Sequence, residues 1–414
     1  MTPASLTLAS SGSDVNTGAI TAPALYAGRL PALDGLRGTA ILAVLICHYS
    51  NLLPLGYSWT GILEGGWVGV DLFFVLSGFL ITGILCDAKG TAHFFRNFYA
   101  RRTLRIFPLY YGFLLLTLAM LLVLHFKHDS RLDAIWPAQP WLWTYTANYW
   151  IAHQPLWTPA IDAIVPLWSL SIEEQFYLLW PVAVFFLSLR NLMRTCVAVM
   201  LGSLILRLVL TTKGASFIVI HLWTPTRADS LAAGALLALL LRLHGNDPRL
   251  RMAISLIGTF AGLLIISLAP GFNPELHPIL RDLLYTPLAI FFAALIFWSI
   301  NPASLAGIPS RFYAWFPLRA IGRYSYGIYI LHLPLMHITR SVLLRYARDF
   351  IADDDWTTSL IMITTNLVAM LVIAVISFEI YEKQFLKLKR RFSAKSMTAP
   401  VPDAPGDAQP AVGL

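Results

Sequence analysis

Charged residues are scarce in this 414-residue chain. Asp, Glu, Lys and Arg make up 13% of it and hydrophobic residues 57%, whereas a soluble domain carries about 25% charged residues. The three cysteines, Cys47, Cys86 and Cys196, stand at unrelated spacings, which excludes a disulfide framework and gives no metal-binding pattern. No polar stretch is long enough to fold on its own. These absences exclude a soluble protein and indicate one that lies in the membrane.

Long apolar segments are what the chain has instead. A membrane-spanning helix needs roughly 20 mostly apolar residues, and such segments recur without the alternation that marks barrel strands. The predicted spans are residues 33–53, 68–86, 107–126, 166–188, 195–212, 222–243, 252–269, 281–300, 319–343 and 359–382. The sequence therefore predicts an all-α, polytopic integral membrane protein with about ten transmembrane helices.

Basic residues set the orientation of these spans. With a cytoplasmic N-terminus, two thirds of the 30 Lys and Arg residues fall on the inside and a fifth on the outside, as the positive-inside rule requires. Both termini are therefore predicted to be cytoplasmic. This bias and contact with anionic membrane lipids explain the net charge of +8, so no nucleic-acid partner is needed. We expect a flexible tail over residues 1–30, one transmembrane domain over 31–390 and a second flexible tail over 391–414.

The first span carries Arg37 near one end and His48 near the other. An ionisable group within a span is costly and by default indicates function. Eleven residues of α-helix bring the two side chains to the same face, roughly 16 Å apart along the axis. They can line one cavity at two depths, and Asp34, one turn before Arg37, can hold its guanidinium. The alternative is that both side chains extend to the membrane interfaces.

Asp71 enters the second span at about the depth that His48 has in the first. A carboxylate beside an imidazole fixes the tautomer of the ring and raises its basicity. Capping of the helix N-terminus by Asp71 is the alternative.

Arg101, Arg102 and Arg105 fall on a predicted inside loop that leads into the third span. Their guanidinium groups can bind phosphate groups in a bidentate manner. Basic residues on an inside loop are also what topology alone demands.

The fourth span contains an unusual number of polar side chains, which need partners within the membrane. They include two adjacent carboxylates that point about 100° apart and therefore serve different tasks. The candidates are Ser169, Ser171, Glu173, Glu174 and Tyr177.

Two later spans add ionisable residues. Arg227 and Asp229 lie in the sixth, where pairing with each other or with another helix is the simpler explanation. His332 lies near the middle of the ninth, and a single histidine there is more often a packing residue than a catalyst.

Together these segments resemble the membrane-bound acyltransferase-3 family. The similarity runs through "GVDLFFVLSGFL", "RRTLRIFPLYY", "WSLSIEEQFYLLWP", "RADSLAAGALLA" and "YSYGIYILHLP", with Arg37 and His48 as the family's arginine–histidine pair. The resemblance implies transfer of an acyl group, most often acetyl, from cytoplasmic acyl-CoA to a hydroxyl of a glycan outside the bacterial inner membrane, such as lipopolysaccharide or exopolysaccharide. Some members carry a fused extracytoplasmic hydrolase-like domain; for this chain we expect such a module to be a separate partner enzyme.

The resemblance also implies roles for the candidate residues. Acyl-CoA acts as donor substrate rather than as a permanently bound cofactor, and its nucleotide and phosphates arrive at the cytoplasmic side. The acceptor hydroxyl arrives from the outside. We expect Arg37, Arg101, Arg102 and Arg105 to bind acyl-CoA, His48, Asp71 and Glu173 to be catalytic, and Ser169, Ser171, Glu174, Tyr177, Arg227 and His332 to support substrate binding.

For the mechanism, the general base is expected to be His48, oriented by Asp71. Ser169, Ser171 or an arginine can stabilise the oxyanion, and an acyl-histidine intermediate is the alternative route. A function of another class is a secondary transporter of a sugar or lipid-linked substrate that uses the intramembrane charges as a proton relay. The chain shows no inverted repeat of the kind that transporters often have.

Overall fold

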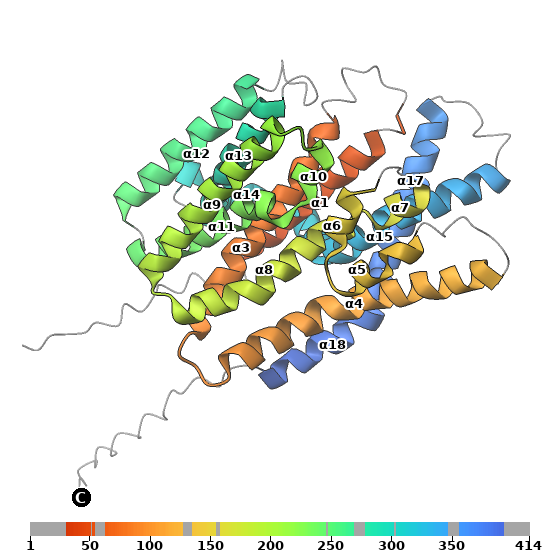
Figure 1. The fold of residues 1–414 in the computed structure, drawn as a ribbon, viewed down its shortest axis with the longest axis horizontal. Helices are drawn as coiled ribbons and strands as arrows, with labels where there is room; N and C mark the ends of the chain where they lie inside the picture. The colour runs from red at the N-terminus through yellow and green to blue at the C-terminus, as the bar shows by residue number, and fades with distance from the viewer. Residues whose placement is uncertain are drawn as a thin grey trace, which may run out of the picture.

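The long helices run side by side as one bundle (Figure 1). The structure is a computed structural model that describes residues 30–50, 52–53, 63–126, 135–154, 158–245, 247–268, 278–301, 304–346 and 356–392, and all regular structure in these ranges is helical. The long helices are α1 (Pro31–Ser50), α3 (Val68–Ala88), α4 (Phe94–Phe126), α8 (Leu167–Phe186), α9 (Leu189–Thr212), α11 (Thr224–His244), α12 (Pro248–Leu268), α13 (Pro278–Ile300), α15 (Phe316–Tyr346) and α17 (Trp356–Ile376).

Short helices connect and cover the long ones. In Figure 1, α12 lies at one end of the bundle and α15 and α17 lie at the other, with α4 and α18 along one side. The short helices are η1 (Gly65–Trp67), α5 (Gln139–Trp143), α6 (Ala147–Ala152), α7 (Pro159–Ile164), α10 (Phe217–Leu222), η4 (Ser304–Gly307), α14 (Ile308–Tyr313), η5 (Ser377–Glu382), α18 (Lys383–Leu388) and η6 (Lys389–Phe392).

Every predicted span coincides with a long helix. Within the described residues, seven helical stretches are long and apolar enough to cross a membrane, and they contain α1, α3, α4, α9, α12, α13 and α17. The polar residues of α8, α11 and α15 lower the mean hydropathy of these three helices. Their length and their position in the bundle make them candidates for further membrane spans. The protein is thus an all-helical, polytopic membrane protein, whereas the count of ten crossings and the cytoplasmic termini remain predictions. Nearly all of both predicted tails lies outside the described residues.

The predicted inside loop before the third span is wrong. Helix α4 begins at Phe94, so Arg101, Arg102 and Arg105 stand on its first half rather than on a loop. No glycine or proline interrupts the chain between Phe94 and Pro108, and the aromatic rings at the start of α4 pack on Phe185 of α8 at centroid distances of 5.5 and 5.0 Å. A helix fixes the directions of the three guanidinium groups far better than a loop does.

Helices α3 and α11 cross in close contact at a pair of glycines. A Cβ atom on Gly78 would lie 1.9 Å from the carbonyl oxygen of Leu231, and a Cβ on Gly234 would lie 1.9 Å from that of Val75. Small residues at such a crossing allow the two backbones to approach within van der Waals distance. This contact fixes α11 against α3, and the buried charged residues of the two helices, Asp71, Arg227 and Asp229, lie in the same part of the bundle.

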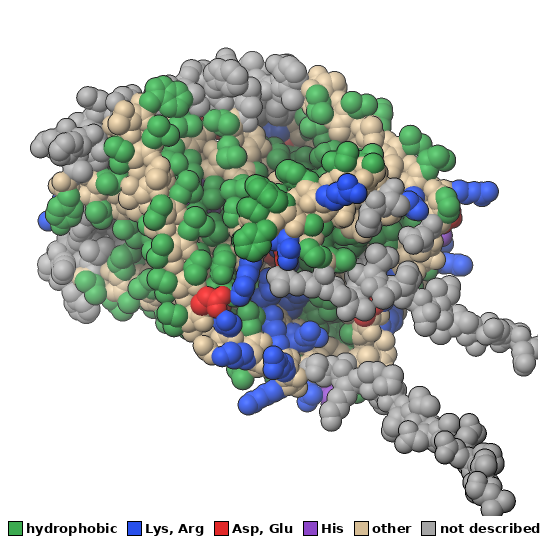
Figure 2. Space-filling view, turned by 180° about the vertical axis from the view of Figure 1, so that it is seen from behind, with side chains coloured by type: hydrophobic (Ala, Val, Ile, Leu, Met, Phe, Trp, Pro, Cys, Tyr) green, Lys and Arg blue, Asp and Glu red, His purple; other side chains and the backbone are tan. Residues whose placement is uncertain are grey.

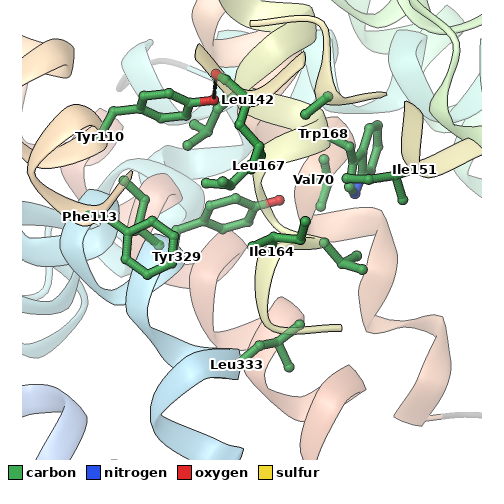
Figure 3. Close-up of a cluster of buried hydrophobic side chains, with 14 of the residues drawn as sticks. Val70, Tyr110, Phe113, Leu142, Ile151, Ile164, Leu167, Trp168, Tyr329 and Leu333 are labelled. Carbon is green, nitrogen blue, oxygen red and sulfur yellow. Dashed lines mark hydrogen bonds between the residues drawn. The ribbon is translucent and has the colours of Figure 1, made fainter. Parts of the chain in front are cut away.

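The segment between α4 and α8 folds back onto the bundle. Tyr110 of α4 donates a hydrogen bond to the carbonyl of Leu142 at 2.8 Å, drawn as a dashed line in Figure 3. Thr158 caps α7 by accepting a hydrogen bond from the backbone N–H of Ile161 at 3.2 Å. These contacts place α7 beside α15, where one of its residues, Asp162, joins the candidate site.

Candidate active site

Three neighbouring cavities follow the length of α1. We call them the arginine cavity, which Arg101 lines, the central cavity, which Glu173 lines, and the histidine cavity, which His48 lines. The arginine and central cavities share Arg37, Leu80, Arg102 and Arg105 as lining residues. Arg37 lines the arginine and central cavities and His48 the histidine cavity, so the two side chains line neighbouring spaces rather than the one cavity that the sequence predicts.

The arginine cavity is strongly basic. Its cationic residues come from α1, from the first half of α4 and from η6, and the described lining includes no Asp or Glu. Lys and Arg side chains gather on this part of the molecule, in the lower middle of Figure 2. The cationic lining residues are Arg37, Arg101, Arg102, Arg105 and Lys389. Such a set attracts a ligand with several negative charges.

Asp34 forms an ion pair with Arg37, with Nη1 and Oδ1 3.7 Å apart, which confirms the predicted contact one turn apart. The guanidinium of Arg102 lies over the rings of Tyr177 and Phe98, with its central carbon 5.5 and 5.9 Å from their centroids. Cation–π contacts of this kind hold an arginine in place without neutralising it. The positive charge of Arg102 therefore stays available to a ligand.

The central cavity is lined by residues of α1, α3, α4, α8 and α15. Glu173 accepts hydrogen bonds from Ser77 at 2.6 Å and from Tyr177 at 3.2 Å. Sequence reasoning placed Glu173 near the outside with His48; the structure instead places it beside Arg37 and Arg102 in the central cavity. The reason is that the polar face of α8 turns toward α3 and α4.

The other polar residues of α8 do not all line a cavity. Glu174 lines the central cavity, and its buried Oε1 has no hydrogen-bond partner in the described part of the chain. Ser169 also lines this cavity and lies 2.6 Å from the hydroxyl of Tyr329. Ser171, in contrast, donates to the carbonyl of Leu167 in its own helix at 2.9 Å. Of the predicted oxyanion donors, Ser169 and the arginines line a cavity, whereas Ser171 does not line any of the three.

The histidine cavity holds His48, His221 and His332 together with Asp162. The rings of His48 and His332 have centroids 5.0 Å apart. His337 donates to Asp162 at 2.8 Å. Imidazoles and a carboxylate around one space are the groups that acid–base chemistry requires.

Aromatic rings form much of the wall of the histidine cavity. Trp67 and Trp168 contact the ring of His221 at centroid distances of 5.5 and 5.0 Å. The central and histidine cavities share Val70 and Tyr329, and Figure 3 shows both residues within the surrounding apolar cluster. Val70 and Tyr329 are thus the side chains common to the walls of both cavities, and we call this pair the neck.

Asp71 does not have the partner that sequence reasoning gave it. Its Oδ1 accepts hydrogen bonds from Arg227 at 2.8 Å and from Ser230 at 2.9 Å, and Asp71 and Arg227 are fully buried. Asp71 thus binds α11 instead of orienting His48 or capping its own helix. The reason is charge compensation, because a buried guanidinium without a carboxylate is very costly.

Interhelical pairing, predicted for Arg227 and Asp229, is confirmed for both. Asp229 accepts from Arg207 of α9 at 2.8 Å. Arg227 also lies over the ring of Tyr285, with its central carbon 4.2 Å from the centroid. These residues form a buried charged layer between α3, α9, α11 and α13 rather than a part of a cavity wall.

Sequence reasoning missed three residues of the cavities. Asp162 is a single carboxylate in the apolar stretch "TPAIDAIVP", and His221 a single histidine in "FIVIHLW"; both carry the same signal that drew attention to His48. Lys389 falls in a basic run that the positive-inside rule already explains, so nothing set it apart. Within the described ranges, no group of three or more His, Cys, Asp or Glu is arranged to hold a metal ion.

Several proteins similar to this chain are named as O-acetyltransferases. Peptidoglycan O-acetyltransferase OatA of Listeria monocytogenes is 31% identical over 385 residues, which cover 89% of this chain and 58% of the relative. Putative peptidoglycan O-acetyltransferase YrhL of Bacillus subtilis is 33% identical over 330 residues, or 76% of this chain and 49% of the relative. O-acetyltransferase OatA of Staphylococcus aureus is 32% identical over 338 residues, or 77% and 52%.

The chain spans about half the length of these relatives. None of the solved structures compared with the chain matches it. The names of these relatives give no support to the transporter hypothesis. The family model described as an acyltransferase domain matches residues 30–379. The chain therefore belongs to the acyltransferase-3 family, as its sequence motifs predict.

Proposed function

We propose that this protein transfers an acyl group, most often acetyl, from cytoplasmic acyl-CoA to a hydroxyl of a glycan on the outer side of the bacterial cytoplasmic membrane. The observation that carries the proposal is the series of cavities, which leads from five cationic side chains to a pair of histidines. The names of the relatives favour a peptidoglycan sugar as acceptor over lipopolysaccharide or exopolysaccharide.

The arginine cavity suits the nucleotide end of acyl-CoA. Phosphate groups carry several charges, and bidentate guanidinium contacts bind them strongly. The first half of α4 directs Arg101, Arg102 and Arg105 into this cavity, and η6 adds Lys389. The pantetheine arm would then extend through the central cavity, past Glu173, toward His48.

The histidine cavity suits the chemical step. One ring nitrogen of His48 takes the hydroxyl proton as the acceptor oxygen bonds to the acyl carbon. The carbon–sulfur bond breaks, and the departing thiolate of CoA takes the proton from His48. Positioned acid–base catalysis of this kind contributes about 10²- to 10⁴-fold. The tryptophan-rich wall suits the apolar face of a sugar ring. An acyl-histidine intermediate on His48 is the alternative route.

The test uses purified protein in lipid vesicles with acetyl-CoA and a soluble peptidoglycan fragment. We expect release of the CoA thiol together with a mass increase of one acetyl group on the sugar. His48→Asn should lower the turnover at least 100-fold while acetyl-CoA still raises the melting temperature. Arg102→Ala should instead weaken the stabilisation of the protein by acetyl-CoA.

Two outcomes would contradict the proposal: full transfer by the His48→Asn variant, or no transfer by the wild type with any glycan offered. Incubation with radiolabelled acetyl-CoA without acceptor distinguishes the two routes. Radiolabel that stays bound to the wild-type protein but not to the His48→Asn variant would establish the covalent intermediate. The involvement of a separate extracytoplasmic partner enzyme stays a prediction.

A further inference from the structure

His332 has a fixed tautomer. Its side chain is buried, 1% exposed, on α15, and its Nδ1 lies 2.6 Å from the carbonyl oxygen of Tyr329. A carbonyl oxygen only accepts, so Nδ1 carries the proton. In the neutral ring, Nε2 then has a lone pair and acts as a hydrogen-bond acceptor.

That acceptor has no partner. Nε2 of His332 is fully enclosed and forms no hydrogen bond with any described residue. Leaving a buried polar atom unsatisfied costs about 1–3 kcal/mol, and such atoms are rare in folded proteins. A purely structural position would be served better by an apolar side chain of similar size. The geometry therefore indicates a donor that arrives in another state of the protein.

His48 is the histidine whose ring contacts that of His332, and it can become this donor. Its ring centroid lies 5.0 Å from that of His332, with the two planes inclined by 51°. Asp162 in the same cavity is a carboxylate bound to His337, and an ionised carboxylate cannot donate. His221 lines the same cavity, but it contacts Tyr285, which lies 2.8 Å from its Nδ1, and the rings of Trp67 and Trp168, rather than His332. With the two rings this close, a change in the orientation of His48 can direct an N–H toward Nε2, and catalytic hydrogen bonds often tighten only when substrate binds.

We propose that Nε2 of His332 accepts a hydrogen bond from a ring N–H of His48 in the reactive complex and so directs the other ring nitrogen of His48 toward the acceptor hydroxyl. This inference depends on the proposed function. His332 is a positioning residue: it neither gains nor loses a proton, while His48 takes the hydroxyl proton and passes it to the CoA thiolate. It has the role that sequence reasoning gave to Asp71.

Two amide variants separate the two nitrogens of His332. His332→Asn keeps a side-chain N–H close to the Nδ1 position, for the carbonyl of Tyr329, but offers no acceptor to His48. His332→Gln can place its carbonyl oxygen close to the Nε2 position. We expect the Asn variant to lose about 10- to 100-fold in kcat with an unchanged KM for acetyl-CoA, and the Gln variant to recover part of that loss.

The order of the two variants decides the outcome. A residue that only packs would tolerate Asn at least as well as Gln, so wild-type kcat in the Asn variant, or equal losses in both, would overturn the inference. Stabilisation by acetyl-CoA reports whether each variant is folded. If the Asn variant does not fold, the Gln variant decides: a kcat within tenfold of wild type supports the inference, and a larger loss overturns it. A wild-type protein without transfer activity would instead overturn the proposed function, and this inference with it.

Discussion

Asp71 and Arg227 illustrate what sequence can and cannot give at the scale of single residues. Both stand out as ionisable residues in apolar spans, and that signal is correct. Their pairing joins positions 156 residues apart, and no local spacing encodes it. The contact between Asp34 and Arg37, in contrast, is one helical turn apart and was predictable from the period of the helix.

Removal of the Asp71 charge should destabilise the protein. In Asp71→Asn the buried guanidinium of Arg227 loses its counter-ion, which should lower the free energy of unfolding by about 3–5 kcal/mol. Denaturant titration of the detergent-solubilised protein measures this change. Replacing both partners by apolar residues, Asp71→Leu with Arg227→Met, should restore most of the stability. If Asp71→Asn is as stable as wild type but inactive, Asp71 takes part in the chemical step rather than in stabilising the fold.

At the scale of elements, the crossing of α3 and α11 depends on two glycines. In Gly78→Ala the new methyl group would meet the backbone of Leu231, and backbone atoms cannot move aside as a side chain can. We expect separation of the two helices, with a loss of several kcal/mol or no folded protein. The yield and melting temperature after purification report this.

The matched control for this crossing is Gly202→Ala on α9. No atom lies within 4 Å of the position that its Cβ would take, so this variant should be as stable as wild type or slightly more stable, since alanine favours a helix. Equal behaviour of the two variants would mean that α3 and α11 are not in such close contact.

Long helices were the most predictable elements, because runs of apolar residues encode them directly. The ends of the long helices were less predictable. Helix α4 begins 13 residues before the predicted span, because its first turns are helical but too basic to be recognised as part of an apolar segment. The short helices α5, α6 and α7 have no periodicity to detect, because five or six residues make fewer than two turns. Asp162 was missed with the helix that carries it.

At the scale of the whole molecule, the neck of Val70 and Tyr329 lies between the cavities to which we assign the acyl arm of the donor and the chemical step. In Val70→Phe the larger ring would enter the space between the central and histidine cavities. We expect acetyl-CoA to stabilise the protein as in wild type while turnover falls at least tenfold, because the thioester no longer passes the neck. Steady-state kinetics and melting curves measure the two effects.

Val70→Ala is the matched control for the neck. It removes volume at the same position and should leave turnover within about threefold of wild type. If Val70→Phe transfers acetyl groups at the wild-type rate, the thioester does not pass between these cavities. A loss of stabilisation by acetyl-CoA in Val70→Phe would instead mean that the fold has changed.

The same neck bears on the energetics of the cell. A cytoplasmic membrane stores an electrochemical gradient, and any enzyme that joins reactants from its two sides is at risk of leaking ions. Here the central and histidine cavities are distinct spaces, and the two side chains that line both of them are an aliphatic group and a tyrosine ring, each mostly buried. An apolar constriction of this kind disfavours a continuous column of water, as hydrophobic gates do in channels.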